Sequence, residues 1–154
     1  MEGLERIVLA HRLFAGLDAE LGQVIAGCAR NVRFEAGQYL FRHGEAAAEL
    51  FLIRHGRVAL EIAEPGGAST VFATEGEGEI VGMASLIPPY LWRLDARAVE
   101  LTRAIGINAA CLRAKCEADH HLGYELMKRI VPEIVQRLDD ARLQSLDVYA
   151  KPNA

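Results

Sequence analysis

Two cysteines and two histidines lie close together in the C-terminal third of the sequence, and both residue types are common metal ligands. They are Cys111, Cys116, His120 and His121. Paired ligands in zinc sites usually lie about two to four residues apart, and the step from Cys111 to Cys116 fits that spacing poorly. We therefore predict no metal site and interpret the thiols as small apolar groups on a helix.

The sequence lacks the short motifs that carry common catalytic chemistry. It has no Gly-x-Ser-x-Gly turn for a serine nucleophile, no phosphate-binding Walker loop, and no Gly-x-Gly-x-x-Gly run that leads into a helix. Two carboxylates occur in the segment Gly76-Glu77-Gly78-Glu79, but its glycines are typical of a turn between strands. The sequence therefore predicts a protein that is not an enzyme.

The composition predicts one water-soluble globular domain. The chain has 154 residues, 51% of them apolar, and a net charge of −4, which argues against nucleic acid as a direct partner. The longest apolar run, residues 82–90, is far shorter than the ~20 residues of a membrane-spanning helix, and no signal peptide is visible. We expect a cytoplasmic protein without a membrane partner. Its three cysteines, Cys28, Cys111 and Cys116, are then expected to be reduced thiols.

Hydrophobic periodicity divides the chain into three zones. From Leu4 to about Ala29, apolar residues recur at three- and four-residue steps, which predicts two helices separated near Gly16. From Asn31 to Ile107, short apolar stretches alternate with glycine-containing turns about every 8–12 residues, the rhythm of an antiparallel sandwich or jelly roll. Helical periodicity returns after Asn108, a candidate N-cap. The predicted fold class is mainly β with flanking helices.

An apolar stripe runs along the C-terminal zone at four-residue steps. It consists of Leu126, Ile130, Ile134 and Leu138. Such a stripe packs either against the chain's own β-zone or against the same helix of a second chain, and both interpretations stay open. Proline inside a helix costs ~3 kcal/mol and removes a hydrogen bond, so Pro132 predicts a kink or a break near residues 130–132. Charged residues of both signs, Arg137 among them, predict a solvated face. We interpret residues 1–150 as a single domain and expect a flexible tail at 151–154.

Several ordered motifs resemble the cyclic nucleotide-binding domain, the sensor domain of catabolite-activator-type (Crp/Fnr) transcription factors, protein kinase A regulatory subunits and gated channels. The motifs are Phe14-Ala15-Gly16-Leu17, Phe34-Glu35-Ala36-Gly37-Gln38-Tyr39-Leu40-Phe41, Arg42-His43-Gly44-Glu45, the run from Leu50 to Val58, and Gly76 through Gly82. The resemblance extends over about residues 12–145. It implies an antiparallel double-stranded β-roll (jelly roll) with N-terminal helices and C-terminal closing helices, and a homodimer that packs through the C-terminal helix.

The resemblance also bears on DNA binding. In the transcription-factor relatives, the long C-terminal helix leads into a helix-turn-helix domain. The sequence stops at Ala154, so we expect no helix-turn-helix domain and no direct contact with DNA.

The resemblance further implies a ligand pocket built around a phosphate-binding cassette. The usual pattern is Gly-Glu-apolar-Ala/Gly-Leu and, about ten residues after the Gly, an Arg that pairs with the cyclic phosphate. The matching residues are Gly82, Met83, Ala84, Ser85 and Leu86, followed by Trp92 and Arg93. Met83 stands where the family has the Glu that binds the ribose hydroxyl, and Trp92 stands where it has the Arg. A hydrogen bond to a charged group contributes about 1.5–3 kcal/mol, so cAMP and cGMP are expected to bind weakly.

Three functions follow as hypotheses. The first is a non-catalytic sensor that binds a flatter, less charged small ligand beside Trp92 and passes its state to an unidentified protein partner. The second is a dimeric assembly protein with a vestigial pocket, in which Trp92 is plain core. The third is an ordinary cyclic nucleotide receptor that uses Arg93 or Arg97, although strand alternation would turn both arginines away from the side that Trp92 faces. No cofactor is predicted beyond a cyclic nucleotide or another small ligand. An open cavity favours the first hypothesis over the second.

Overall fold

The computed structural model describes residues 2–150, and the expected tail at 151–154 lies outside the described residues. The helical elements are α1 (Glu2–Ala10), the 3-10 turn η1 (Arg12–Phe14), α2 (Ala19–Ala26), α3 (Ala109–Ala118) and α4 (His120–Ala150). The strands are β1 (Ala29–Phe34), β2 (Tyr39–Phe41), β3 (Glu49–His55), β4 (Val58–Ala63), β5 (Ser69–Glu75), β6 (Ile80–Val81), β7 (Asp95–Ala98) and β8 (Thr102–Asn108), with the 3-10 turn η2 (Met83–Leu86) after β6. This confirms the predicted fold class, mainly β with flanking helices.

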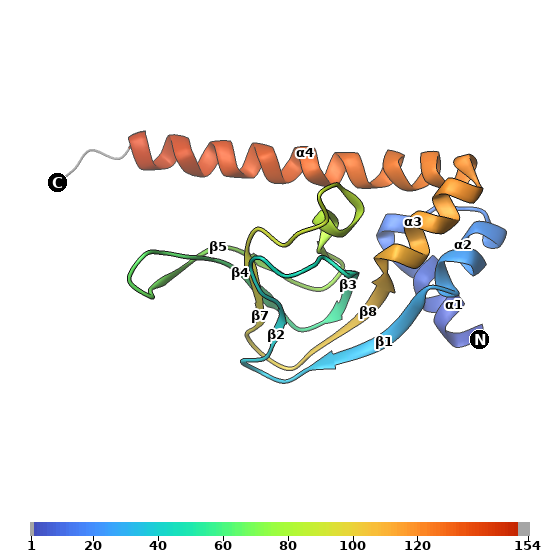
Figure 1. Cartoon of the computed structure of the whole chain (residues 1–154), viewed down its shortest axis with the longest axis horizontal. Helices are drawn as coiled ribbons and strands as arrows, with labels where there is room; N and C mark the ends of the chain where they lie inside the picture. Colours follow the sequence, from blue (N-terminus) through green and yellow to red (C-terminus); the bar gives the residue numbers. More distant parts are fainter. Residues whose placement is uncertain (1, 151–154) are drawn as a thin grey trace.

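The strands form two four-stranded antiparallel sheets whose orders are β1-β8-β3-β6 and β2-β7-β4-β5. Strands that follow one another in sequence are mostly not neighbours, because the chain crosses between the sheets as it rolls up. Figure 1 shows α1, α2 and α3 gathered at one end of the roll, while α4 runs along its length. No helix within residues 2–150 is long and apolar enough to cross a membrane.

One strand supplies side chains to two hydrophobic cores. On β3, Leu50 and Leu52 pack with the helices, whereas Phe51 and Ile53 pack between the two sheets. Successive strand residues point to opposite faces of the sheet, and the helices cover one face of β3 while the second sheet covers the other. The sequence of β3 from Leu50 to Ile53 is therefore a continuous run of apolar residues. The turn that follows β3 requires glycine, because Gly56 has φ +96 and a Cβ there would lie 2.4 Å from the backbone oxygen of Leu101.

Helix α4 continues through Pro132, so the break is excluded from the two alternatives predicted there, a kink or a break. Contacts on both sides of the proline hold the helix against the rest of the molecule. Arg129 donates a hydrogen bond to the backbone oxygen of Ala15 at 3.1 Å, and Arg137 donates one to the backbone oxygen of Ile80. These contacts, together with buried apolar packing, offset the hydrogen bond that the proline removes.

The interpretation of the α4 stripe as a dimer seam needs a correction. Leu126 and Ile130 are fully buried in the core between the helices and the roll, and Ile134 packs against that core. Leu138, by contrast, is 48% exposed. The stripe therefore packs mainly against the chain's own β-roll, and Leu126 and Ile130 offer no surface to a second chain. Apart from Leu138 of the stripe, the large apolar side chains that α4 exposes among the described residues are Tyr124, Met127, Val131, Val135, Leu143 and Leu146.

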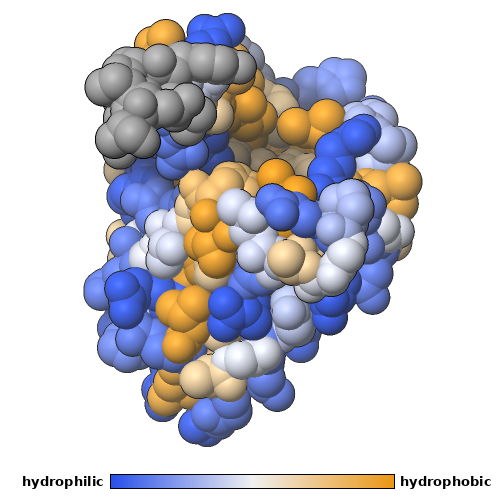
Figure 2. Space-filling view, turned by 90° about the vertical axis from the view of Figure 1, so that its left-hand side faces the viewer, coloured by the Kyte–Doolittle hydropathy of each residue, from blue (hydrophilic) through white to orange (hydrophobic). Residues whose placement is uncertain are grey.

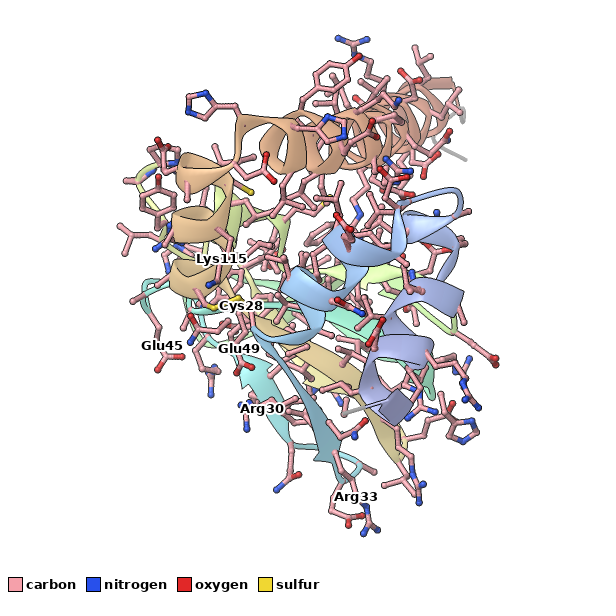
Figure 3. The ribbon with its side chains drawn as sticks, turned by 90° about the vertical axis from the view of Figure 1, so that its right-hand side faces the viewer. Cys28, Arg30, Arg33, Glu45, Glu49 and Lys115 are labelled. Carbon is pink, nitrogen blue, oxygen red and sulfur yellow. A yellow bond between two sulfur atoms is a disulfide. The ribbon has the colours of Figure 1, made fainter. Side chains whose placement is uncertain are left out.

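The expectation of three reduced thiols is also wrong, because Cys28 and Cys111 form a disulfide, and Cys116 is free. Figure 3 shows the bond beside the label of Cys28. Ala29 at the start of β1 pairs with Ile107, the last but one residue of β8. Cys28 therefore lies close to the first turn of α3, which carries Cys111. The count of cysteines carries no information on this proximity, which comes from the strand register.

We predict that Leu126→Ala lowers the free energy of unfolding by about 2–5 kcal/mol, because it leaves a cavity between α4 and the roll. The matched control is Leu143→Ala on the same helix, where the leucine is 60% exposed and the change should stay within about 0.5 kcal/mol. Urea unfolding followed by circular dichroism measures both values. Equal losses for the two variants would contradict this placement of α4.

Candidate functional site

A cavity of about 350 Å³ lies between the two sheets, the η2 turn and α4. Figure 2 shows a hollow with hydrophobic residues around it on the face turned toward the C-terminal end of α4. The lining residues are Phe41, Leu60, Val81, Gly82, Met83, Ala84, Ile87, Pro88, Pro89, Leu91, Trp92, Arg93, Leu94, Ile134 and Arg137. Two of these residues, Arg93 and Arg137, are charged, and the rest of the wall is apolar. The cavity therefore suits a ligand with an apolar body.

The structure brings together most of the residues that the cassette pattern singled out. Those that line the cavity are Gly82, Met83, Ala84, Trp92 and Arg93. Ser85 lies behind the wall, fully buried, and its hydroxyl donates a hydrogen bond to the backbone oxygen of Gly82 at 2.7 Å. Leu86 packs against the core on the helix side. The η2 turn thus presents its first residues to the cavity and anchors its last two inside the fold.

Trp92 forms part of the cavity wall and is 5% exposed. Its ring stacks on Phe41 with a centroid distance of 3.7 Å and an interplanar angle of 9°. Gly82 also lies close to the indole, because a Cβ at this position would lie 3.0 Å from the Cη2 atom of the ring. Phe41 and Gly82 therefore hold the indole in one orientation, and a cavity remains open beside it.

The backbone on each side of Trp92 is fixed as well. Its amide donates a hydrogen bond to the oxygen of Glu45 at 2.9 Å, and its oxygen accepts one from the amide of Gly44 at 2.8 Å. Met83, which is buried, also lines the cavity and offers a thioether without charge. Neither Met83 nor Trp92 can supply the carboxylate or the guanidinium that the cassette pattern has at these positions.

Arg93 also lines the cavity, so the expectation that it points away from the Trp92 side is wrong. The expectation assumed a regular strand through residues 92–97, but β7 begins only at Asp95. Without the two-residue alternation of a strand, consecutive side chains can face the same space. Arg93 is exposed, and no described carboxylate lies within 4.0 Å of its guanidinium.

Arg97, the other arginine considered, is engaged elsewhere. Its Nε donates a hydrogen bond to Glu61 at 2.6 Å, and Glu61 also accepts one from the hydroxyl of Ser69. Glu61 is 3% exposed, and separating this pair would leave an unpaired buried charge, which is strongly unfavourable. Arg97 is outside the cavity lining and stays with Glu61, which removes it as a substitute for the missing guanidinium.

Sequence reasoning missed the contribution of α4, which adds Ile134 and Arg137 to the cavity wall. Arg137 donates a hydrogen bond to the backbone oxygen of Ile80, and its Nε lies 3.9 Å from a carboxylate oxygen of Glu75. Burial raises the pKa of the Glu75 carboxyl above its ordinary value, and the charge of Arg137 acts in the opposite direction. The sequence predicted only that Arg137 lies on a solvated face, because the docking of a helix against distant strands leaves no local signal.

Arg113 of α3 fixes the loop that forms one side of the cavity. Its guanidinium donates a hydrogen bond to the backbone oxygen of Ser85 at 2.5 Å and lies 4.0 Å from the ring centroid of Tyr90. Tyr90 itself has φ +58, a conformation in which non-glycine residues are uncommon. The position and the orientation of the η2 segment therefore depend on these contacts with α3.

The comparisons with known proteins agree with this geometry. A sequence model described as the cyclic nucleotide-binding domain matches residues 31–119. A putative cyclic nucleotide-binding protein from Geobacter metallireducens is 31% identical, with a TM-score of 0.76 over 90% of this chain and 99% of that chain. A search of curated proteins finds no match.

Two more distant structures share the fold. The sensor domain of the transcriptional regulator DNR from Pseudomonas aeruginosa is 20% identical, with a TM-score of 0.72 over 90% of this chain and 95% of that chain. A mutant regulatory subunit of a cAMP-independent protein kinase A from Trypanosoma brucei, bound to cAMP in its A site, is 21% identical, with a TM-score of 0.74 over 94% of this chain and 50% of that chain. The family model matches more than half of the sequence, and this chain belongs to the cyclic nucleotide-binding domain family.

Proposed function

We propose that this domain is a non-catalytic sensor whose cavity binds a flat, mostly apolar small molecule with one anionic group, and binds cAMP and cGMP weakly. One observation carries the proposal. The indole of Trp92, stacked on Phe41, forms part of the cavity wall, and the resemblance to the cassette pattern leads us to expect an arginine at this position. The wall thus offers an aromatic surface where a cyclic phosphate needs a cation.

The energetic argument concerns the phosphate. A hydrogen bond to a charged group contributes about 1.5–3 kcal/mol, which corresponds to roughly a ten- to hundredfold change in affinity. Trp92 supplies no opposite charge to a phosphate at its own position, so the hydration that the phosphate loses there adds a further cost. Met83 removes a second polar contact at the position of the ribose-binding Glu. Both substitutions weaken the binding of a cyclic nucleotide and leave the binding of an apolar ligand unaffected.

The charged edge of the cavity supports one anionic group on the ligand. Arg93 is exposed and lacks a carboxylate within 4.0 Å in the described part of the chain. Arg137 enters from α4 with its charge only partly offset by Glu75 at 3.9 Å. A ligand could place an aromatic body on the apolar wall and a carboxylate at these guanidinium groups. The open cavity favours this sensor over a vestigial pocket.

The position of α4 supplies a route to a partner. Ile134 and Arg137 contact the cavity, while the exposed side of the same helix carries Tyr124, Val131 and Val135. A ligand that contacts Ile134 and Arg137 would favour one position of α4 and so alter the exposed face. We propose that this face, rather than Leu126 and Ile130, forms a homodimer, because it leaves large apolar side chains in water in a single chain.

Arg93 also sustains a second candidate, an ordinary cyclic nucleotide receptor in which Arg93 replaces the missing arginine. The observation in its favour is that Arg93 lines the cavity. Against it stands Trp92, which takes the wall position next to Arg93. The neighbour from Trypanosoma brucei is described as cAMP-independent, so the fold also occurs in a regulatory protein with that description.

Calorimetric titration with cAMP and cGMP should show no saturation at low micromolar concentration, because no guanidinium occupies position 92. The double variant Met83→Glu/Trp92→Arg restores both polar groups and should bind cAMP at least about tenfold more tightly. Val71→Arg is the matched control, since it adds a charge at an exposed position of β5 outside the cavity lining. Low-micromolar binding by the unchanged protein that Arg93→Gln abolishes would establish the second candidate instead.

A flat aromatic carboxylate, 2-naphthoate, should bind and change the fluorescence of Trp92, the single tryptophan of the chain. The affinity for 2-naphthoate should fall roughly tenfold in Arg93→Gln and in Arg137→Gln. The affinity for neutral 2-methylnaphthalene should stay the same. Arg142→Gln on the same helix, 69% exposed and outside the cavity lining, is the control. Failure of the folded protein to bind either compound would contradict a ligand-binding cavity and favour the vestigial pocket.

Sedimentation velocity should show a dimer that Val131→Glu/Val135→Glu converts to a monomer, since the variant puts two charges into the proposed seam. Ile62→Glu, a charge on an isoleucine of β4 that is 51% exposed, should leave the dimer intact. If the unchanged protein sediments as a monomer at about 0.1 mM, a concentration at which even a weak interface should form, the dimer is contradicted. The ligand titrations test the cavity independently of this result.

A further inference from the structure

Three arginines from three adjacent strands lie in a row across the outer face of one sheet. They are Arg33 of β1, Arg103 of β8 and Arg54 of β3, and all three are exposed. Arg33 and Arg103 are directly opposite each other in the register, and the β3–β8 register has its irregularity between Ile53 and His55, next to Arg54. Figure 3 shows Arg33 at the end of β1 that points away from the helices.

The strand pattern explains why the three side chains share one face. Val32 and Phe34 of β1 pack into the core between the sheets, as do Ile53 of β3 and Ala104 of β8. Their sequence neighbours therefore point outward. The helices α1 and α2 cover the other end of this outer face through Leu52 and Ile105, and the arginine row lies beyond that cover.

The row surrounds a surface hollow of about 440 Å³. Its lining residues are Asn31, Val32, Arg33, Arg54, Arg103 and Ala104. This hollow is separate from the cavity beside Trp92, because the two have no lining residue in common. A ligand here would contact the outer face of the β1-β8-β3-β6 sheet.

Among the described residues, only one arginine of the row has a carboxylate partner. Arg33 pairs with Glu35 at 2.9 Å, but both side chains are about 60% exposed, and such pairs are worth only ~0–1 kcal/mol. Arg54 contacts the neutral amide of Asn31 at 3.5 Å. No described carboxylate lies within 4.0 Å of Arg103. Like charges directly opposite on neighbouring strands are destabilising, so the row does not serve the stability of the sheet.

The spacing of the row limits the anion that fits it. Neighbouring strands are about 4.8 Å apart, so the three arginines span about 10 Å across the sheet. A single phosphate meets one or two guanidinium groups, whereas two or three linked phosphates can meet all three. The planar guanidinium matches pairs of phosphate oxygens. A net charge of −4 and a compact hollow disfavour a nucleic-acid strand, which would need an extended basic surface.

We propose that the hollow formed by Arg33, Arg54 and Arg103 binds a small polyphosphate anion, a linked di- or triphosphate, either free or as part of a nucleotide. The anion would neutralise the repulsion between Arg33 and Arg103 and so stabilise the folded chain. This inference does not depend on the proposed ligand of the other cavity.

Calorimetry at about 0.15 M salt, where surface charges are screened beyond roughly 8 Å, should detect binding of tripolyphosphate and weaker binding of inorganic phosphate. The affinity for tripolyphosphate should fall about tenfold in Arg103→Gln and in Arg54→Gln. Arg103→Lys should recover only part of the loss, because an ammonium lacks the paired donors. Arg142→Gln is the control for loss of an exposed positive charge elsewhere, and excess 2-naphthoate should not displace the anion.

A second readout separates binding from folding. Arg103→Gln alone should leave the melting temperature unchanged or raise it, since it removes a repulsion, yet it should abolish the increase that tripolyphosphate causes in the unchanged protein. ATP that binds more tightly than tripolyphosphate would assign the site to a nucleotide, and equal affinities would assign it to the phosphates alone. No binding at millimolar tripolyphosphate, or equal losses in Arg103→Gln and Arg142→Gln, would overturn the proposal.

Discussion

The packing of α4 against the β-roll is the interaction on which the rest of the site depends. Leu122, Leu126 and Ile130 close the core on the helix side, and this places Ile134 and Arg137 over the cavity. The same docking decides which side of α4 remains in water. A helix can bury only one face against one neighbour, so the cavity wall and the exposed apolar face are consequences of a single rotation of α4 about its axis. In the proposed function, this single rotation links ligand occupancy to contact with a partner.

Membership of a ligand-binding family fixes the scaffold and leaves the ligand open. The η2 turn, the roll and the closing helix are all present. Met83 and Trp92 place a thioether and an indole where the resemblance to the cassette pattern leads us to expect a carboxylate and a guanidinium. The stack between Trp92 and Phe41 makes that exchange part of the core. Function resides in the chemistry of a site and not in the fold that carries it, and here that chemistry favours an apolar surface with positive charge at its edge.

Arginine has several roles in this molecule, and the neighbours of each guanidinium decide which one it has. Arg97 is bound to buried Glu61, and Arg113 holds the loop of the cavity through Ser85 and Tyr90. Both are structural contacts. Arg93 and Arg103, in contrast, have no described carboxylate within 4.0 Å, and each lines a hollow. A charge that the fold leaves unpaired beside a hollow is the clearest sign of an external partner that this structure offers.

The sequence alone determined the order of the elements, the mainly β class and the chemical types at Met83 and Trp92, because periodicity and turn glycines are local properties that each segment carries with it. Tertiary structure decided the direction of Arg93, the entry of Arg137 into the cavity, the face of α4 that is buried, the bond between Cys28 and Cys111, and the arginine row. Each of these depends on strand register or on helix docking, which bring together residues far apart in the chain. A hydrophobic pattern records that a side chain is buried and does not record what it is buried against.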